Sequence, residues 1–139
     1  MPLMLTKLLF IALGGSVGAV LRYGLTGLAQ RLADGTAIEG FPVGTLAVNL
    51  LGCLLIGGLG AYFAGPHLVR EEYRAFLLVG LLGAFTTFST FGWETFELVN
   101  DRQLGLAGLN ILLSNAIGLA GVWIGYRLVE HFAAGAGAA

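Results

Sequence analysis

Four long apolar stretches make up most of the chain, and short polar segments separate them. A helix of about 20 apolar residues crosses the hydrocarbon core of a bilayer, because each residue adds about 1.5 Å of length. The pattern therefore predicts an all-α membrane protein with four transmembrane helices in one domain, residues 1–132. The predicted spans are residues 3–32, 43–64, 74–99 and 104–129, and the small residues 133–139 are expected to form a disordered tail.

The third stretch contains a polar run at bilayer depth. The nine residues Gly83–Phe91 include three threonines, one serine and three phenylalanines. β-branching and hydroxyl groups that bond backbone carbonyls weaken a helix, and glycine lowers helix propensity further. Backbone groups freed in the bilayer must be satisfied by protein or water. We therefore expect the third helix to be broken mid-membrane and to line an interior path.

The first two stretches each contain polar side chains that need an explanation. Arg22 lies deep in the first, where it either snorkels to the interface or faces an aqueous vestibule that attracts an anion. Thr45 and Asn49 are four residues apart in the second, so they share one helix face. Asn49 should face protein or a cavity, and a structural helix-to-helix hydrogen bond is the alternative to a binding role.

The fourth stretch carries a stripe of polar and small residues. Asn110, Ser114 and Gly118 recur at four-residue intervals, so they lie on one face, either lining a path or packing in the core. Glu94 and Glu97, near the end of the third stretch, are expected to lie at a solvated helix end.

Composition excludes several classes of function. Only 11% of the 139 residues are charged, against about 25% in soluble domains. The net charge of −1 gives no reason to expect nucleic-acid binding, and the single Cys53 excludes a disulfide framework. We find no catalytic constellation, so we do not expect an enzyme. The absence of an ATP site and of an acidic residue within the membrane favours passive flow.

Two features indicate self-association. Small residues spaced by four, such as Gly14 with Gly18 and Gly57 with Ala61, let helices approach closely in lipid. A four-helix bundle this small has little interior of its own, so we expect it to oligomerise.

The distribution of basic residues bears on orientation. With four spans, the side that holds both termini has four Lys or Arg residues and the other side has two, if Arg22 is not counted. This bias is weak under the positive-inside rule. Insertion in both orientations, to give an antiparallel dimer, is therefore a hypothesis.

Three stretches in order resemble the CrcB/Fluc family of fluoride channels: Gly14–Tyr23, Gly44–Gly52 and Gly83–Phe91. The resemblance covers nearly the whole chain. It implies a dual-topology homodimer in the cell inner membrane, in which antiparallel subunits form two pores. It also implies a fluoride-selective passive channel that exports F⁻ from the cytoplasm and relieves fluoride toxicity.

The resemblance also implies site residues. A structural Na⁺ would lie on the two-fold axis, held by the backbone carbonyls of Gly83 and Thr86 from both subunits. Arg22 matches an arginine of the anion vestibule. The residues that match the fluoride path are Phe88, Phe91, Asn49, Thr45, Ser89, Thr90, Asn110 and Ser114. Relatives often have Tyr at position 110 and a hydroxyl at position 118, where this chain has Asn and Gly.

Two alternative functions make different predictions. A small dual-topology multidrug exporter would need a carboxylate in the membrane, and the first stretch has Arg22 there and no acidic residue. A purely structural membrane subunit would produce no ion leak in reconstituted vesicles.

Overall fold

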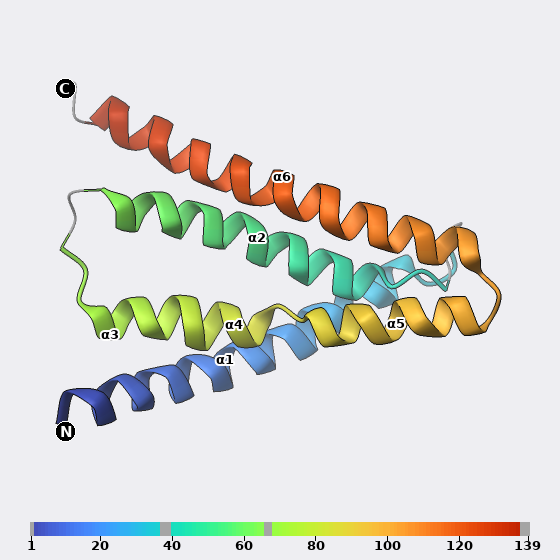
Figure 1. Ribbon diagram of the computed structural model, residues 1–139, viewed down its shortest axis with the longest axis horizontal. Helices are drawn as coiled ribbons and strands as arrows, with labels where there is room; N and C mark the ends of the chain where they lie inside the picture. Colours follow the sequence, from blue (N-terminus) through green and yellow to red (C-terminus); the bar gives the residue numbers. More distant parts are fainter. Residues whose placement is uncertain (1, 37–39, 66–67, 137–139) are drawn as a thin grey trace.

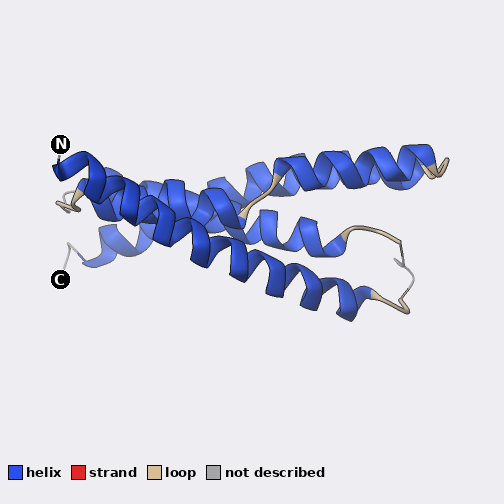
Figure 2. Ribbon diagram, turned by 90° about the horizontal axis from the view of Figure 1, so that it is seen from below, coloured by secondary structure: helices blue, strands red, loops and turns tan. Residues whose placement is uncertain are grey.

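The computed structural model describes residues 2–36, 40–65 and 68–136, and all regular elements within these ranges are helices (Figures 1 and 2). Four helical runs are long and apolar enough to cross a membrane: Met4–Ala33, Val43–Ala64, Glu71–Asn100 and Leu104–Ala133. The prediction of an all-α membrane protein with four spans is confirmed. The elements are α1 (Pro2–Ala33), α2 (Val43–Ala64), α3 (Glu71–Arg74), the π-helical η1 (Ala75–Leu82), α4 (Gly83–Phe85), α5 (Phe88–Asn100) and α6 (Leu104–Ala136).

The helices run up and down, and both chain ends lie at the same end of the bundle (Figure 1). In that view α6 lies beside α2, the run from α3 to α5 lies on the other side of α2, and α1 crosses behind. The closest packing joins α2 to α6 and α1 to η1. The bundle is therefore built from two tightly packed helix pairs.

Glycines allow the close approach of α1 to η1. A Cβ atom on Gly18 would overlap the Leu81 carbonyl oxygen, and one on Gly80 would lie 2.6 Å from the Ile11 carbonyl oxygen. Gly14 likewise meets the backbone of Phe76. The small-residue spacing in the first stretch therefore marks a real backbone-to-backbone contact, as expected for helices packed in lipid.

The contact between α2 and α6 depends on glycine in the same way. A Cβ atom on Gly57 would overlap the Val122 carbonyl, whereas a Cβ on Gly60 would meet nothing within 4 Å. These two glycines lie on the same helix and so give a matched pair for substitution.

We expect Gly57→Ala to lower the thermal stability of the purified protein, because inserting a methyl group into a packed interface typically costs about 1–3 kcal/mol. Gly60→Ala should leave stability unchanged or raise it, since alanine favours helix over glycine by about 1 kcal/mol. Thermal denaturation in detergent checks the pair, and equal effects of the two substitutions would contradict the packing described here.

The third span is broken, as predicted, but the break is shorter than the polar run that predicted it. Only Thr86 and Thr87 leave the helix, and both have extended backbone angles. Figure 2 shows this segment as a loop that interrupts the helical run. Gly83–Phe85 and Phe88–Asn100 on either side remain helical.

The π-helical form of η1 was not predicted. A π-helix adds one residue to each turn and is often found near functional sites. The apolar residues of η1 carry no pattern that distinguishes a π-helix from an α-helix. The difference depends on how this segment packs against α1, which the sequence does not state.

The C-terminal prediction needs correction. Helix α6 continues to Ala136, beyond the predicted end near residue 129, so residues 133–136 are helical and not a disordered tail. Alanine, the commonest residue in this segment, has the highest helix propensity, which explains the extension. Residues 137–139 lie outside the described part of the chain.

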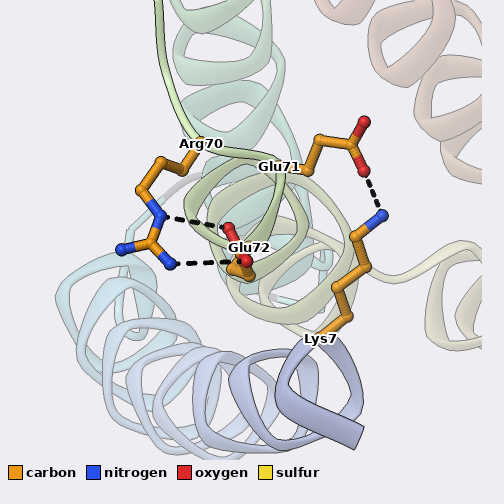
Figure 3. A network of polar contacts seen from close by, with 4 residues as sticks. All are labelled: Lys7, Arg70, Glu71 and Glu72. Carbon is orange, nitrogen blue, oxygen red and sulfur yellow. Dashed lines mark hydrogen bonds and ion pairs between the residues drawn. The ribbon is translucent and has the colours of Figure 1, made fainter. Parts of the chain in front are cut away.

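Charged side chains join α1 to the start of the third span (Figure 3). Lys7 forms an ion pair with Glu71, and the Arg70 guanidinium lies 3.4 Å from the carboxylate of Glu72, which is 8% exposed. Lys7 and Glu71 are exposed, so solvent screens their ion pair and it contributes little to stability. The pairing explains how a loop rich in charge can lie at the end of an apolar bundle.

Candidate functional site

The break in the third span is held by one side chain of α2. The Thr87 N–H donates to Asn49 Oδ1 at 2.8 Å, and Asn49 Nδ2 donates to the Thr87 carbonyl at 3.1 Å. Asn49 therefore satisfies both polar groups of an extended residue at bilayer depth, where unpaired backbone groups are costly. The structural helix-to-helix role that the sequence left open for Asn49 is present.

Thr87 in turn begins helix α5. Its Oγ1 accepts a hydrogen bond from the Thr90 N–H at 3.2 Å, which makes Thr87 an N-cap, and it donates to Thr90 Oγ1 at 2.9 Å. Ser89 Oγ lies 3.3 Å from the same hydroxyl. The sequence analysis did not select Thr87, although a threonine directly before a helix start is a recognised N-cap signal.

The hydrogen bonds that Asn49 and Thr87 accept leave two backbone carbonyls without their helical N–H donors. In a continuous α-helix, the N–H groups of Thr87 and Thr90 would bond the carbonyls of Gly83 and Thr86, four residues earlier. Both N–H groups bond side chains instead. The carbonyls of Gly83 and Thr86 have therefore lost their helical donors, which fits the ligand set expected for a hard cation such as Na⁺.

Side-chain carboxylates and imidazoles offer no comparable metal site. Over the described ranges 2–36, 40–65 and 68–136, no three His, Cys, Asp or Glu residues come together to hold a metal ion. A cation at the break would therefore depend on backbone oxygens.

The Thr86 side chain packs against Gly52 of α2, which lies about one turn after Asn49. Its hydroxyl donates to the Leu82 carbonyl at 3.0 Å, which fixes the direction of the side chain. The Thr86 methyl group lies where a Cβ atom on Gly52 would be. Asn49 therefore holds the break by hydrogen bonds, and Gly52 leaves the space that the Thr86 side chain occupies.

Two hollows meet at Thr87. The first, of about 310 Å³, brings together six of the predicted residues and lies beside the break. The second, of about 370 Å³, lies on the α1 side. The predicted residues of the first hollow are Asn49, Gly83, Thr86, Phe88, Phe91 and Ser114, and those of the second are Arg22, Thr45 and Thr90. Thr87 lines both.

The two predicted phenylalanines differ in their surroundings. Their ring centroids are 5.5 Å apart, and both rings line the first hollow. Phe91 is 9% exposed, whereas Phe88 is 83% exposed. In a single chain, the first hollow therefore has a ring on its open side with no neighbour to cover it.

Arg22 is half-buried and lines the second hollow with Thr45, Thr87 and Thr90. These residues give one cation and three hydroxyl groups in a single concave site. Thr45 and Thr87 donate their hydroxyl protons to Glu94 and Thr90. Within this set, the Arg22 guanidinium and the Thr90 hydroxyl are therefore the groups that can attract or donate to an anion. The role of Arg22 in an anion vestibule stays a prediction.

Glu94 is less exposed to solvent than predicted, although it lines a hollow together with Gly40 and Asp101 of the loops. It is half-buried within the third span, and its Oε1 accepts a hydrogen bond from Thr45 Oγ1 at 2.6 Å. Its Oε2 is buried with no hydrogen-bond partner among the described residues. Thr45 lies in the first turn of α2, so this hydrogen bond lies near one end of the bundle. Glu97 is exposed, as predicted.

Asn110 belongs to a hydrogen-bonded chain inside the bundle. Ser114 Oγ donates to Asn110 Oδ1 at 3.4 Å, Asn110 Nδ2 donates to Thr95 Oγ1 at 2.9 Å, and Thr95 donates to the Phe91 carbonyl at 2.7 Å. Asn110 is 2% exposed and lines neither hollow, whereas Ser114 lines the first. Thr95 was not selected from the sequence, since a lone hydroxyl in a helix is not diagnostic. Gly118 lies beside the Cys53 thiol.

Comparison with known proteins places the chain in a family. The model of the family described as "CrcB-like protein, Camphor Resistance (CrcB)" matches residues 9–126. A protein of Geobacter sulfurreducens named fluoride-specific ion channel FluC is 46% identical over 87% of this chain and 94% of its own length. A protein of the same name from Shewanella amazonensis is 45% identical over 90% of this chain and 97% of its own length. A third, from Methylobacillus flagellatus, is 37% identical over 89% and 94%. The chain is therefore a multi-pass membrane protein that belongs to the CrcB family.

Proposed function

We propose that this protein is a fluoride-selective passive ion channel that exports F⁻ across the cell inner membrane and so relieves fluoride toxicity. One observation carries the proposal. The break in the third span gathers two phenylalanine rings, an asparagine amide and a serine hydroxyl around one hollow. The relatives that share this sequence over most of their length are named for the same activity.

The chemistry of the hollow suits fluoride. Aromatic rings have positive edges that stabilise a small anion without binding it strongly. Hydroxyl and amide donors replace part of the hydration shell, and fluoride accepts hydrogen bonds more strongly than chloride. A narrow path with several weak sites lets the ion leave as well as enter.

The pore is completed by a second copy of the chain in antiparallel orientation. Phe88 is exposed on the open side of the first hollow, and a partner would cover it. The chain also carries only a weak bias of basic residues, four on one side and two on the other, which is compatible with insertion in both orientations. Two subunits related by a two-fold axis would form two pores.

A structural Na⁺ fits the centre of such a dimer. Gly83 and Thr86 line the first hollow, and the helical donors of their carbonyls bond elsewhere. Contributed by both chains, these oxygens would give four hard ligands. The cation would link the broken third spans of the two subunits. It would also coordinate backbone carbonyls to which lipid tails cannot donate a hydrogen bond.

A proton-coupled transporter is a second candidate, because such a protein needs a partly buried carboxylate and Glu94 provides one. The carboxylate is half-buried and hydrogen-bonded to Thr45, which lines the second hollow. The channel remains the better supported function, since the relatives are named as ion channels.

Fluoride efflux from proteoliposomes tests the proposal. Vesicles loaded with KF and containing the purified protein should release fluoride when valinomycin allows K⁺ to follow, with no pH gradient applied. A fluoride electrode records the release, and protein-free vesicles are the control. Equal release of chloride from KCl-loaded vesicles would overturn selectivity, and release that requires an imposed proton gradient would support the transporter instead.

A further inference from the structure

Two side chains at the break each accept a hydrogen bond from a backbone N–H that a regular helix would pair with a carbonyl. The first is Asn49, whose Oδ1 takes the Thr87 N–H, and the second is Thr87, whose Oγ1 takes the Thr90 N–H. In a regular helix these two donors belong to the carbonyls of Gly83 and Thr86. The two residues whose carbonyls lose their helical donors are thus the two expected to bind a cation.

We infer that Asn49 and Thr87 are positioning residues of the cation site: each diverts one backbone N–H and so keeps one carbonyl available as a ligand. The inference rests on the proposed function, because it concerns the Na⁺ of that proposal. It assigns to Asn49 a role distinct from contact with the permeating anion, and it assigns a role to a threonine that the pattern of the sequence did not single out.

Each of the two side chains is held against one particular backbone N–H. Asn49 bonds the N–H and the carbonyl of Thr87 together, at 2.8 and 3.1 Å, so the amide fixes the orientation of that peptide group. Thr87 is 7% exposed, and its hydroxyl is within hydrogen-bond distance of Ser89 and Thr90. Thr87 is therefore largely shielded from water, whereas Asn49 is half-buried and lines the first hollow.

Loss of either acceptor would let the helix close. If Oγ1 of Thr87 is removed, the Thr90 N–H regains the Thr86 carbonyl as its nearest acceptor in a helical backbone. That carbonyl would then be shared between an N–H donor and the cation. The affinity for Na⁺ should fall, whereas the fold of the four spans should persist because the helix pairs pack elsewhere.

Thr87→Val and Thr87→Ser test this directly, because valine keeps the branched shape without the oxygen and serine keeps the oxygen. The thermal midpoint of the full-length protein in detergent is measured against Na⁺ concentration, with N-methyl-D-glucamine chloride keeping ionic strength constant. A ligand that binds only the native state raises the midpoint with its concentration. We expect the Na⁺ concentration for half-maximal stabilisation to rise at least about tenfold in Thr87→Val and less than about threefold in Thr87→Ser.

A second pair covers the case in which Thr87→Val cannot be purified. Asn49→Asp keeps the acceptor for the Thr87 N–H, whereas Asn49→Leu has a similar size and no acceptor. The leucine variant should lose the Na⁺ response and the aspartate variant should keep it. Equal half-stabilising Na⁺ concentrations within both pairs would overturn the inference.

Parallel fluoride-efflux measurements on the wild-type protein separate the two proposals. Fluoride-selective efflux without any Na⁺-dependent stability would overturn the inference and leave the channel intact. A Na⁺ response that differs between Thr87→Val and Thr87→Ser, in a protein that releases no fluoride, would support the inference and overturn the channel.

Discussion

Phe88→Ala should lower fluoride efflux at least about tenfold, which corresponds to about 1.4 kcal/mol in the barrier to permeation. The Phe88 ring lines the first hollow with Phe91, and its edge offers positive charge to an anion that has lost part of its hydration shell. Alanine leaves the same position without a polar or aromatic group. Efflux from proteoliposomes, measured with a fluoride electrode at equal protein density, gives the ratio.

The exposure of Phe88 makes this substitution easy to interpret. At 83% exposure in the single chain, the ring contributes little to the packing of its own bundle. Phe96→Ala is the matched control, because Phe96 lies on the same helix, is 57% exposed and does not line the first hollow. Phe96→Ala should conduct normally. Normal conduction by Phe88→Ala, in a protein whose elution volume on size-exclusion chromatography is unchanged, would remove Phe88 from the proposed pore.

Phe91 calls for a milder change, since it is 9% exposed and its deletion would also create a cavity. Truncation of a buried phenylalanine to alanine typically costs about 3–5 kcal/mol of stability. Phe91→Leu removes the ring with less loss of volume, so reduced efflux can be separated from unfolding. If Phe88→Ala and Phe91→Leu both conduct normally, the aromatic path assigned to this hollow is wrong.

Gly52→Ala should also impair efflux strongly, through the position of the break. A methyl group at residue 52 overlaps the Thr86 methyl group, and the Thr86 hydroxyl is already committed to the Leu82 carbonyl. The overlap has to displace either α2 or the extended segment that shapes the hollow. We expect a loss of about 1–3 kcal/mol in stability and a loss of efflux of about tenfold or more.

A second substitution should reverse this effect. Thr86→Ser deletes the offending methyl group and keeps the hydroxyl that bonds Leu82, so Gly52→Ala with Thr86→Ser should recover efflux and thermal midpoint. Double-mutant cycles of residues in contact give coupling energies of about 0.5–3 kcal/mol. Strictly additive effects in the double variant would show that the contact between Gly52 and Thr86 does not position the break. Gly60→Ala, on the same helix with open space around it, is the control.

The four spans were predictable because their signal is local. A continuous run of apolar residues long enough to cross a bilayer has few alternatives, and the predicted bounds of α2, residues 43–64, match the helix observed. The broken third span was also predictable, since three threonines and a glycine within nine apolar-flanked residues oppose a regular helix. The end of α6 was less predictable, because alanines and a glycine are compatible with both a helix and a disordered tail.

The sequence placed polar residues on helix faces but did not reveal their contacts. Periodicity put Thr45 and Asn49 on one face of α2, yet the two side chains bond different partners, Glu94 and Thr87. Glu94 was placed with solvent because its distance along the chain from Thr45 hides their contact. Ser114 and Asn110 share a helix face, but only Ser114 reaches the first hollow.

The sequence by itself determined that this chain spans a membrane four times and that its third span leaves the helix, because hydrophobic length and β-branched hydroxyl residues act within a single segment. Tertiary structure decided which two residues leave the helix, because Asn49 from α2 supplies the hydrogen bonds that an extended Thr87 needs at that depth. It also decided which polar side chains meet around one hollow, since contacts between helices depend on where glycines let two backbones approach.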